Sequence, residues 1–327
     1  MRFLLSVLVT LFAVGLTLGS CLAEEGRRWA VVVGVNDYQK PSVTDLRYAE
    51  NDAKLFSSAL CQVGGFEPER VFLYTTGAER PEERPLLTNL VYRMESLKDL
   101  VSKEDSLFFY FAGHGVEIEG ESFLLTENAD NRSRATLTMS ALRAELLLEL
   151  LRACDAKETL IVLDACRNDP MAGRGSEDNR LSESMSRGLV FSPRRDDAVE
   201  KSLATLLACG VGERSYEWPE KQHGYFTYHL VEGMKSQASD SSGEVNLAGL
   251  SRYVREKVSQ DAKQAGHTQQ PSLKYEGPGP EHWILAQSRE PRPTQQPASE
   301  LEKLKQELRL LRAENSRLKA ELEKLRR

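Results

Sequence analysis

The stretch that decides the fold is ETLIVLDACRNDP, residues Glu158–Pro170. It contains the apolar and β-branched run Thr159–Leu163, and a polar turn follows Cys166. A short apolar run bounded by turn residues is typical of a strand that is buried on both faces of a parallel sheet. Cys166 therefore lies just past the carboxyl end of a predicted strand, where open α/β sheets hold their ligands.

A second stretch has the same design. The apolar run Leu107–Ala112 is followed by Gly113-His114-Gly115, so an imidazole ends this strand as a thiol ends the other. An imidazole beside a thiol takes its proton and stabilises the thiolate, which is the reactive form of cysteine. The two stretches therefore predict a Cys–His pair that two adjacent strands hold at one end of a sheet.

The remaining apolar pattern alternates between strands and helices. Further strands are predicted at residues 29–35, 71–74 and 202–209. Helices are predicted where apolar residues recur at spacings of three and four: Leu46, Ala49, Ala53, Phe56 and Leu60; Leu90, Met94, Leu97 and Val101; Leu142, Leu146 and Leu150; Tyr225, Phe226, Leu230 and Met234; and Leu247, Leu250, Val254 and Val258. This alternation predicts an α/β fold with a parallel sheet that helices cover on both faces.

The A-C-R sequence at Cys166, with His114 about 50 residues upstream, resembles the caspase-like cysteine peptidases. Within them it resembles the metacaspase or bacterial caspase-like branch. The resemblance implies that Cys166 is the nucleophile and His114 the base. It also implies that the backbone amides of Gly115 and Cys166 form the oxyanion hole, where each donor contributes about 10²–10³ in rate.

The resemblance covers residues 27–287 and implies a three-layer sandwich with a mostly parallel central sheet. It divides this domain into a large part at 27–166, a loop at 167–201 and a small part at 202–287. The loop is rich in arginine, so we expect it to offer basic cleavage sites close to the nucleophile.

Asp164, two residues before the nucleophile, indicates the substrate preference. Caspases that cut after Asp carry Gln there, whereas metacaspase-like enzymes carry Asp, which pairs with Arg or Lys before the cut. Asp52 resembles the second acidic wall of that pocket, and a guanidinium forks well onto carboxylates. The alternatives are that Asp164 caps backbone amides at the strand end and that Asp52 lies on a solvated helix face.

The chain also departs from the metacaspase pattern. Arg167-Asn168-Asp169 follows the nucleophile where metacaspases have His-Ser-Gly, and Ala112 stands where they often have Ser. Many metacaspases need calcium. Glu127, Asp130 and Asp169 are available but form no recognisable calcium loop, so we expect no required cofactor and keep calcium as an option.

The N-terminus has the pattern of a secretory signal peptide over residues 1–23. Cleavage before Cys21, at a sequence like a bacterial lipobox, would leave a lipid-bearing cysteine and a membrane-anchored periplasmic lipoprotein. Cleavage after Ala23 would free a soluble chain, and an uncleaved membrane anchor is the third alternative. The net charge is −6 with basic residues interspersed, so we expect no nucleic-acid partner.

The C-terminus predicts an assembly element. Residues 288–299 form a Pro-rich polar linker, and residues 300–327 carry leucine heptads with Glu at every g position and a basic residue at every e position. One Asn, Asn315, occupies an a position, which favours an in-register pair of helices. We expect a parallel homodimer through this coiled coil, with pairing to a similar zipper as the alternative.

The patterns at the two ends of the chain, with what the resemblance implies, lead us to expect an exported cysteine endopeptidase that cuts peptides or proteins after Arg or Lys. The alternative is a catalytically weak or inactive caspase-like binding module that its coiled coil assembles.

Overall fold

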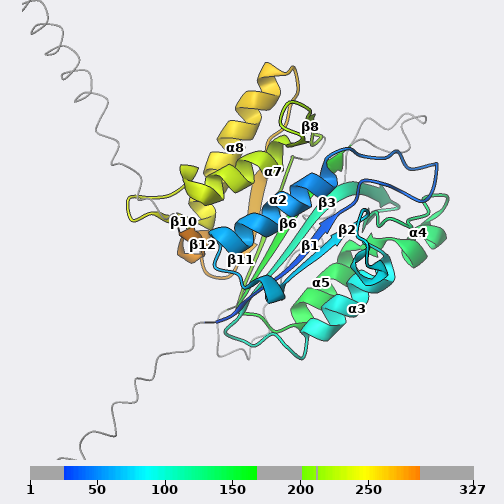
Figure 1. Cartoon of the computed structure of the whole chain (residues 1–327), viewed down its shortest axis with the longest axis horizontal. Coiled ribbons are helices and arrows are strands. Elements are labelled where there is room, and N and C mark those ends of the chain that lie inside the picture. Colours follow the sequence, from blue (N-terminus) through cyan, green and yellow to red (C-terminus); the bar gives the residue numbers. More distant parts are fainter. Residues whose placement is uncertain (1–25, 168–200, 211–212, 288–327) are drawn as a thin grey trace, which may run out of the picture.

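The computed structural model describes residues 26–167, 201–210 and 213–287 (Figure 1). At Cys166 and Arg167 it describes the backbone alone. The predicted signal peptide, lipidation site, arginine-rich loop, linker and coiled coil lie outside the described residues. Among the helices that are described, none has the length and hydropathy needed to cross a membrane.

The centre of the domain is one sheet with the strand order β11-β7-β6-β3-β1-β2. Its parallel strands are β1 (Arg28–Gly34), β2 (Val71–Thr75), β3 (Ser106–Ile118), β6 (Glu158–Arg167) and β7 (Ser202–Leu207). All five contain the predicted apolar runs, so the parallel sheet is confirmed. The edge strand β11 (Ser272–Glu276) runs antiparallel to β7 and was not predicted.

Helices cover the sheet on both faces, which gives three layers (Figure 1). One face carries α2 (Ala49–Gln62), α7 (Tyr225–Glu232) and α8 (Leu247–Gln264). The other carries α3 (Leu87–Leu97) and α5 (Ala144–Ala153). The remaining elements are short: β4 (Glu121–Leu124), α4 (Arg134–Ser140), β5 (Leu142–Arg143), β8 (Glu217–Trp218), β9 (His223–Gly224), β10 (Glu244–Asn246), β12 (Ile284–Gln287), a π-helix (Gly233–Gln237) and 3₁₀ turns at Pro68–Arg70, Pro81–Glu83 and Pro280–His282.

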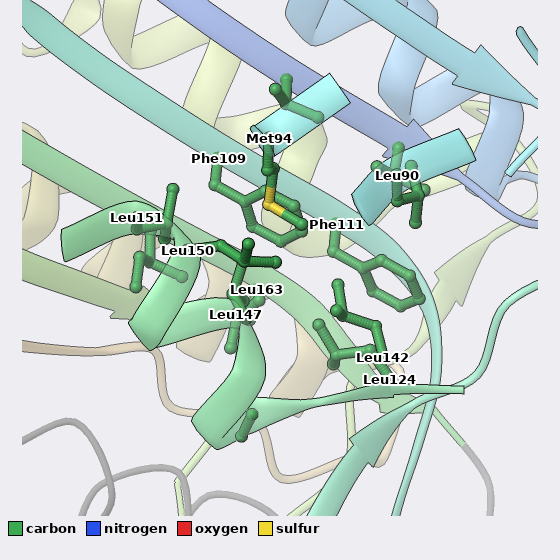
Figure 2. Close-up of a cluster of buried hydrophobic side chains, with 14 of the residues drawn as sticks. Leu90, Met94, Phe109, Phe111, Leu124, Leu142, Leu147, Leu150, Leu151 and Leu163 are labelled. Carbon is green, nitrogen blue, oxygen red and sulfur yellow. The ribbon is translucent and has the colours of Figure 1, made fainter. Parts of the chain in front are cut away.

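Alternate residues of β3 build the two hydrophobic cores. Phe109 and Phe111 point towards α3 and α5, where they meet Met94 and Leu147 (Figure 2). The neighbouring residues Phe108 and Tyr110 belong to the core on the α2, α7 and α8 face. Burying each large apolar side chain contributes about 1.5–3 kcal/mol, so β3 is fixed from both sides.

The helix predicted from Leu142, Leu146 and Leu150 is displaced. Leu142 lies in β5, and α5 buries Ala144, Leu147, Leu148, Leu150 and Leu151, whereas Leu146 is only partly buried. Leucines occupy so many neighbouring positions here that several helical faces fit the pattern. The structure selects the face that packs on β4 and α3.

Candidate active site

The pairing of β3 with β6 brings the predicted base and nucleophile to neighbouring positions. In the parallel register Ala112 pairs with Asp164 and His114 pairs with Cys166. The register shifts at this point, because His114 also pairs with Arg167. Two residues far apart in sequence therefore have adjacent backbones at the carboxyl end of the central strands.

His114 is buried, with 1% of its surface exposed, and two contacts fix its orientation. Its backbone N–H donates to the Tyr38 hydroxyl at 2.8 Å, and its Nε2 lies 2.8 Å from the Thr44 carbonyl oxygen. A carbonyl oxygen only accepts, so a neutral imidazole in this position carries its proton on Nε2. Nδ1 is then the basic nitrogen of the ring.

Gly113 leaves space for the Tyr38 side chain beside His114, because any larger residue at this position would place a Cβ too close to its neighbours. A Cβ on Gly113 would lie 2.8 Å from the Phe111 ring and 3.2 Å from the Tyr38 hydroxyl. The ring of Tyr38 also packs beside the His114 ring, with 5.2 Å between centroids. The glycine before the histidine thus lets the Tyr38 loop approach the imidazole from its main-chain side.

The loop that carries Tyr38 and Thr44 is anchored by contacts to three parts of the fold. Val35 N–H donates to Ala112 O at 2.9 Å, which ties the start of the loop to β3. Asn36 Oδ1 accepts from the Glu50 amide at 3.0 Å, which ties the loop to the first turn of α2. Glu217, which belongs to the small part of the domain, accepts from the amides of Arg47 and Tyr48 through Oε1, at 3.0 Å and 3.1 Å.

Asp164 is fully buried and accepts hydrogen bonds from two hydroxyl groups. Ser215 Oγ donates to its Oδ1 at 2.6 Å, and Thr227 Oγ1 donates to its Oδ2 at 2.8 Å. Thr227 lies in the first turn of α7. The carboxylate predicted to recognise substrate is therefore held by the small part of the domain.

Asp52 is fully buried as well, so the alternative of a solvated helix face is wrong. Its Oδ1 lies 3.0 Å from His223 Nδ1, and the Gly224 amide donates to both oxygens at 3.0 Å and 3.1 Å. Gly224 is the N-cap of α7. Asp52 and Asp164 thus contact the same end of one helix, whose N-terminal dipole favours negative charge.

Gly115 follows His114 in β3 and pairs with Leu124 of β4. Leu125 N–H donates to the His114 carbonyl at 2.9 Å, so the hairpin continues directly from the histidine. The predicted oxyanion donors, the amides of Gly115 and Cys166, therefore belong to neighbouring strands. Their role stays a prediction.

Two of the three acidic residues considered for calcium, Glu127 and Asp130, accept hydrogen bonds from arginines. Arg84 Nε donates to Glu127 at 3.0 Å, and Arg132 Nε donates to Asp130 at 2.9 Å. The bond from Arg132 lowers the pKa of Asp130 to about 2. Within the described ranges, no group of three or more His, Cys, Asp or Glu side chains could hold a metal ion. Asp169 lies outside those ranges, so calcium binding stays a prediction.

Among the described cysteines away from the site, Cys61 and Cys154 have surroundings that disfavour the thiolate. Burial raises the pKa of Cys154 to about 11, and burial also raises the pKa of the half-buried Cys61. Cys209 is buried and donates to the Glu213 carbonyl at 3.5 Å. A raised pKa keeps the thiol protonated, so Cys61 and Cys154 are unsuited to nucleophilic attack at neutral pH.

Residues 27–278 match the caspase domain family, peptidase C14, and the chain therefore belongs to this family of cysteine peptidases. Metacaspase-1 of Pyricularia oryzae is 32% identical over 94 residues, which cover 29% of this chain and 23% of that protein. Metacaspase-1A of Aspergillus oryzae is 32% identical over 90 residues, which cover 28% of this chain and 21% of that protein.

A solved structure of a Geobacter sulfurreducens protein shares the fold. It aligns with a TM-score of 0.52 at 15% sequence identity, covering 80% of this chain and 98% of that one. The fold is thus the α/β sandwich with a mostly parallel sheet that the resemblance implied.

Proposed function

We propose that the chain is an exported cysteine endopeptidase that cuts after Arg or Lys through a His114–Cys166 dyad. The observation that carries this proposal is the strand register that pairs His114 with Cys166, together with the Nε2 contact to Thr44. That contact makes Nδ1 the nitrogen that accepts a proton, and a histidine near neutral pH is suited to this exchange.

In the proposed reaction the Cys166 thiol gives its proton to Nδ1 of His114, and the thiolate attacks the scissile carbonyl. The amides of Gly115 and Cys166 stabilise the oxyanion that develops. The protonated imidazole then gives its proton to the leaving amine, and an acyl-enzyme remains. Water attacks the thioester with His114 again acting as base, which releases the acid and restores the thiol.

The two buried carboxylates support a basic residue before the cut. Asp52 and Asp164 both contact the N-terminal end of α7, at Gly224 and Thr227. A guanidinium forks well onto a carboxylate, so two carboxylates at the end of one helix support a basic residue before the cut.

A peptide assay tests the proposal. Fluorogenic peptides that differ only in the residue before the cut, Arg, Lys or Asp, are given to wild type, Cys166→Ala and His114→Ala. We expect cleavage of the two basic peptides alone and loss of that cleavage in both variants. Cleavage by Cys166→Ala at the wild-type rate, or a preference for Asp, would contradict the proposal.

A caspase-like binding module with little or no turnover is the second candidate. The observation that favours it is the state of the two carboxylates, which are 0% exposed and already accept hydrogen bonds within the domain. The same assay separates the candidates, because a binding module would retain the peptides without cutting any of them.

The ends of the chain support the remaining parts of the proposal. Their sequence favours export with a lipid on Cys21 and a parallel homodimer through residues 300–327. Mass spectrometry of the mature N-terminus distinguishes a lipidated Cys21 from a free Glu24. Sedimentation of Leu311→Pro tests the zipper, which must lose the dimer if the coiled coil forms it.

A further inference from the structure

Two hydroxyl groups hold the Asp164 carboxylate, one at each oxygen. Ser215 donates to Oδ1 and Thr227 donates to Oδ2, at 2.6 Å and 2.8 Å. A single donor would fix only the position of one oxygen. Two donors on different oxygens also fix the plane of the carboxylate, so both the location and the orientation of this group are set by the protein.

Each hydroxyl also contacts a second buried side chain. The Tyr110 hydroxyl lies 2.6 Å from Thr227 Oγ1, and Gln269 Nε2 lies 3.2 Å from Ser215 Oγ. A hydroxyl has one proton, and an ionised carboxylate only accepts. The hydroxyls of Thr227 and Ser215 therefore donate to Asp164. The Tyr110 hydroxyl donates to Thr227, and Gln269 Nε2 donates to Ser215.

Gln269 is itself fixed on both sides of its amide. Its Nε2 also donates to the Ala208 carbonyl at 3.0 Å, and its Oε1 accepts from the Tyr216 amide at 3.1 Å. Tyr110 is fully buried in the middle of β3. The hydroxyls at Asp164 thus cannot turn away without breaking bonds to rigid elements, and such linked bonds strengthen one another.

We propose that Thr227, supported by Tyr110, is a positioning residue that makes the enzyme prefer Arg to Lys before the cut. This rests on the proposed function, in which Asp164 binds the basic side chain. A guanidinium is a planar fork that gains from a carboxylate of fixed plane. An ammonium is a point charge with rotatable donors, so it tolerates a carboxylate that turns.

The test compares Arg and Lys peptides in wild type and Thr227→Val. Valine keeps the shape of threonine but cannot donate. We expect kcat/KM for the Arg peptide to fall about tenfold, chiefly through KM, and the value for the Lys peptide to change much less. Thr227→Ser should restore the preference. Tyr110→Phe should give a smaller loss, because Thr227 keeps its own proton.

Thr205→Val is the matched control. Thr205 is also buried in the small part of the domain, in β7, where it alternates with Ala204 and Leu206 of the α7 face. We expect Thr205→Val to leave the ratio of kcat/KM for the Arg and Lys peptides unchanged. A general loss of packing would likewise affect both peptides alike.

An equal fall for both peptides in Thr227→Val would overturn the role of Thr227 and leave the proposed function intact. Wild type that prefers Lys would also overturn it. Wild type that cuts neither peptide would overturn the proposed function and this inference with it. If Thr227→Val does not fold, as circular dichroism would show, the ratio in Tyr110→Phe decides, and an unchanged ratio there rejects the proposal.

Discussion

The His114 imidazole takes its orientation from two contacts, one at its own amide and one at its ring. Both partners, Tyr38 and Thr44, come from the loop between β1 and α2. Thr44 contributes only its carbonyl oxygen, so its side chain carries no signal of this role. The contact at the ring of the predicted base is therefore made by a main-chain oxygen.

Tyr38→Phe tests the first contact. The change removes the acceptor of the buried His114 N–H, and an unsatisfied buried donor costs about 1–3 kcal/mol. We expect a loss of that size in the free energy of unfolding, measured with urea, together with a lower kcat. Tyr92→Phe is the control, because Tyr92 is 76% exposed. Equal stability of the two variants would count against the contact.

His229, in the small part of the domain, makes the stability of the whole domain depend on pH. Burial lowers the pKa of His229, and the hydrogen bond to Asp261 on α8 opposes this without cancelling it. Lys257 lowers the pKa further and Glu232 raises it. Below about pH 6.5, His229 is protonated in the unfolded chain but stays neutral in the folded chain, because its folded pKa is lower. The free energy of unfolding therefore falls as the pH drops.

We expect the unfolding free energy of wild type to fall between pH 7 and pH 5, and to fall less in His229→Gln. Denaturant titrations at several pH values measure this difference. His282→Gln, at an exposed position, is the control and should keep the wild-type dependence. A His229 variant with the full wild-type slope would show that another group is responsible.

At the scale of elements, α2 and α7 are joined by a carboxylate. Asp52 of α2 binds His223 and the N-cap amide of α7, which links the large part of the domain to the small part. Asn51 adds a bond to the Gln222 carbonyl at 3.1 Å. The start of α7 therefore depends on α2 for its position, and Thr227 follows three residues later.

Asp52→Ala should cost about 2–4 kcal/mol in unfolding free energy, because it leaves buried donors without their acceptor. Thermal or urea unfolding measures the loss, and exposed Ser58→Ala on the same helix is the control. A cost below that of the control would mean that Asp52 serves substrate binding and contributes nothing to the link.

The strands of the sheet were predictable where they are buried on both faces. β1, β3, β6 and β7 each contain a short, largely apolar run, which is typical of a parallel sheet covered on both faces. The antiparallel β11 was missed because it is an edge strand with Lys274 and Tyr275 exposed, so its sequence shows no such run. Edge strands carry polar residues that hide their pattern.

The candidate site was predictable only in part for a similar reason. His114 and Cys166 each end an apolar run, which is a local signal. The bonds to His114 from Tyr38 and Thr44 join residues 76 and 70 positions apart. Those to Asp164 from Ser215 and Thr227 join residues 51 and 63 positions apart. Tyr38, Thr44 and Ser215 lie in irregular segments without periodicity, and the apolar pattern of α7 predicts the helix but not the contact that Thr227 makes.

At the scale of the whole molecule, the two parts of the domain share one sheet. β6 pairs with β7 along its length from Glu158 to Leu163, and both hydrophobic cores contain residues from each part. No separate core exists within the described residues that would let either part unfold alone. The large and small parts therefore form one cooperative unit.

A cut within residues 168–200 should leave this unit assembled, because the cut severs no strand or core contact of the described residues. We expect the nicked protein to elute as one species and to unfold in one urea transition. Arg174, Arg180, Arg187, Arg194 and Arg195 lie in this segment, so a basic specificity allows self-cleavage there. Cys166→Ala is the control, and an identical fragment pattern in both proteins would reject self-cleavage.

The Glu217 carboxylate helps to fix the loop that orients the His114 imidazole. It accepts from the amides of Arg47 and Tyr48, a few residues after Thr44, and it belongs to the far part of the chain. Before the segment that carries Glu217 packs against this loop, the turn at Arg47 and Tyr48 lacks these two hydrogen bonds, which would leave the loop around His114 less well fixed. If His114 is the base of the proposed reaction, its site is therefore complete only after the C-terminal part of the domain has packed against this loop.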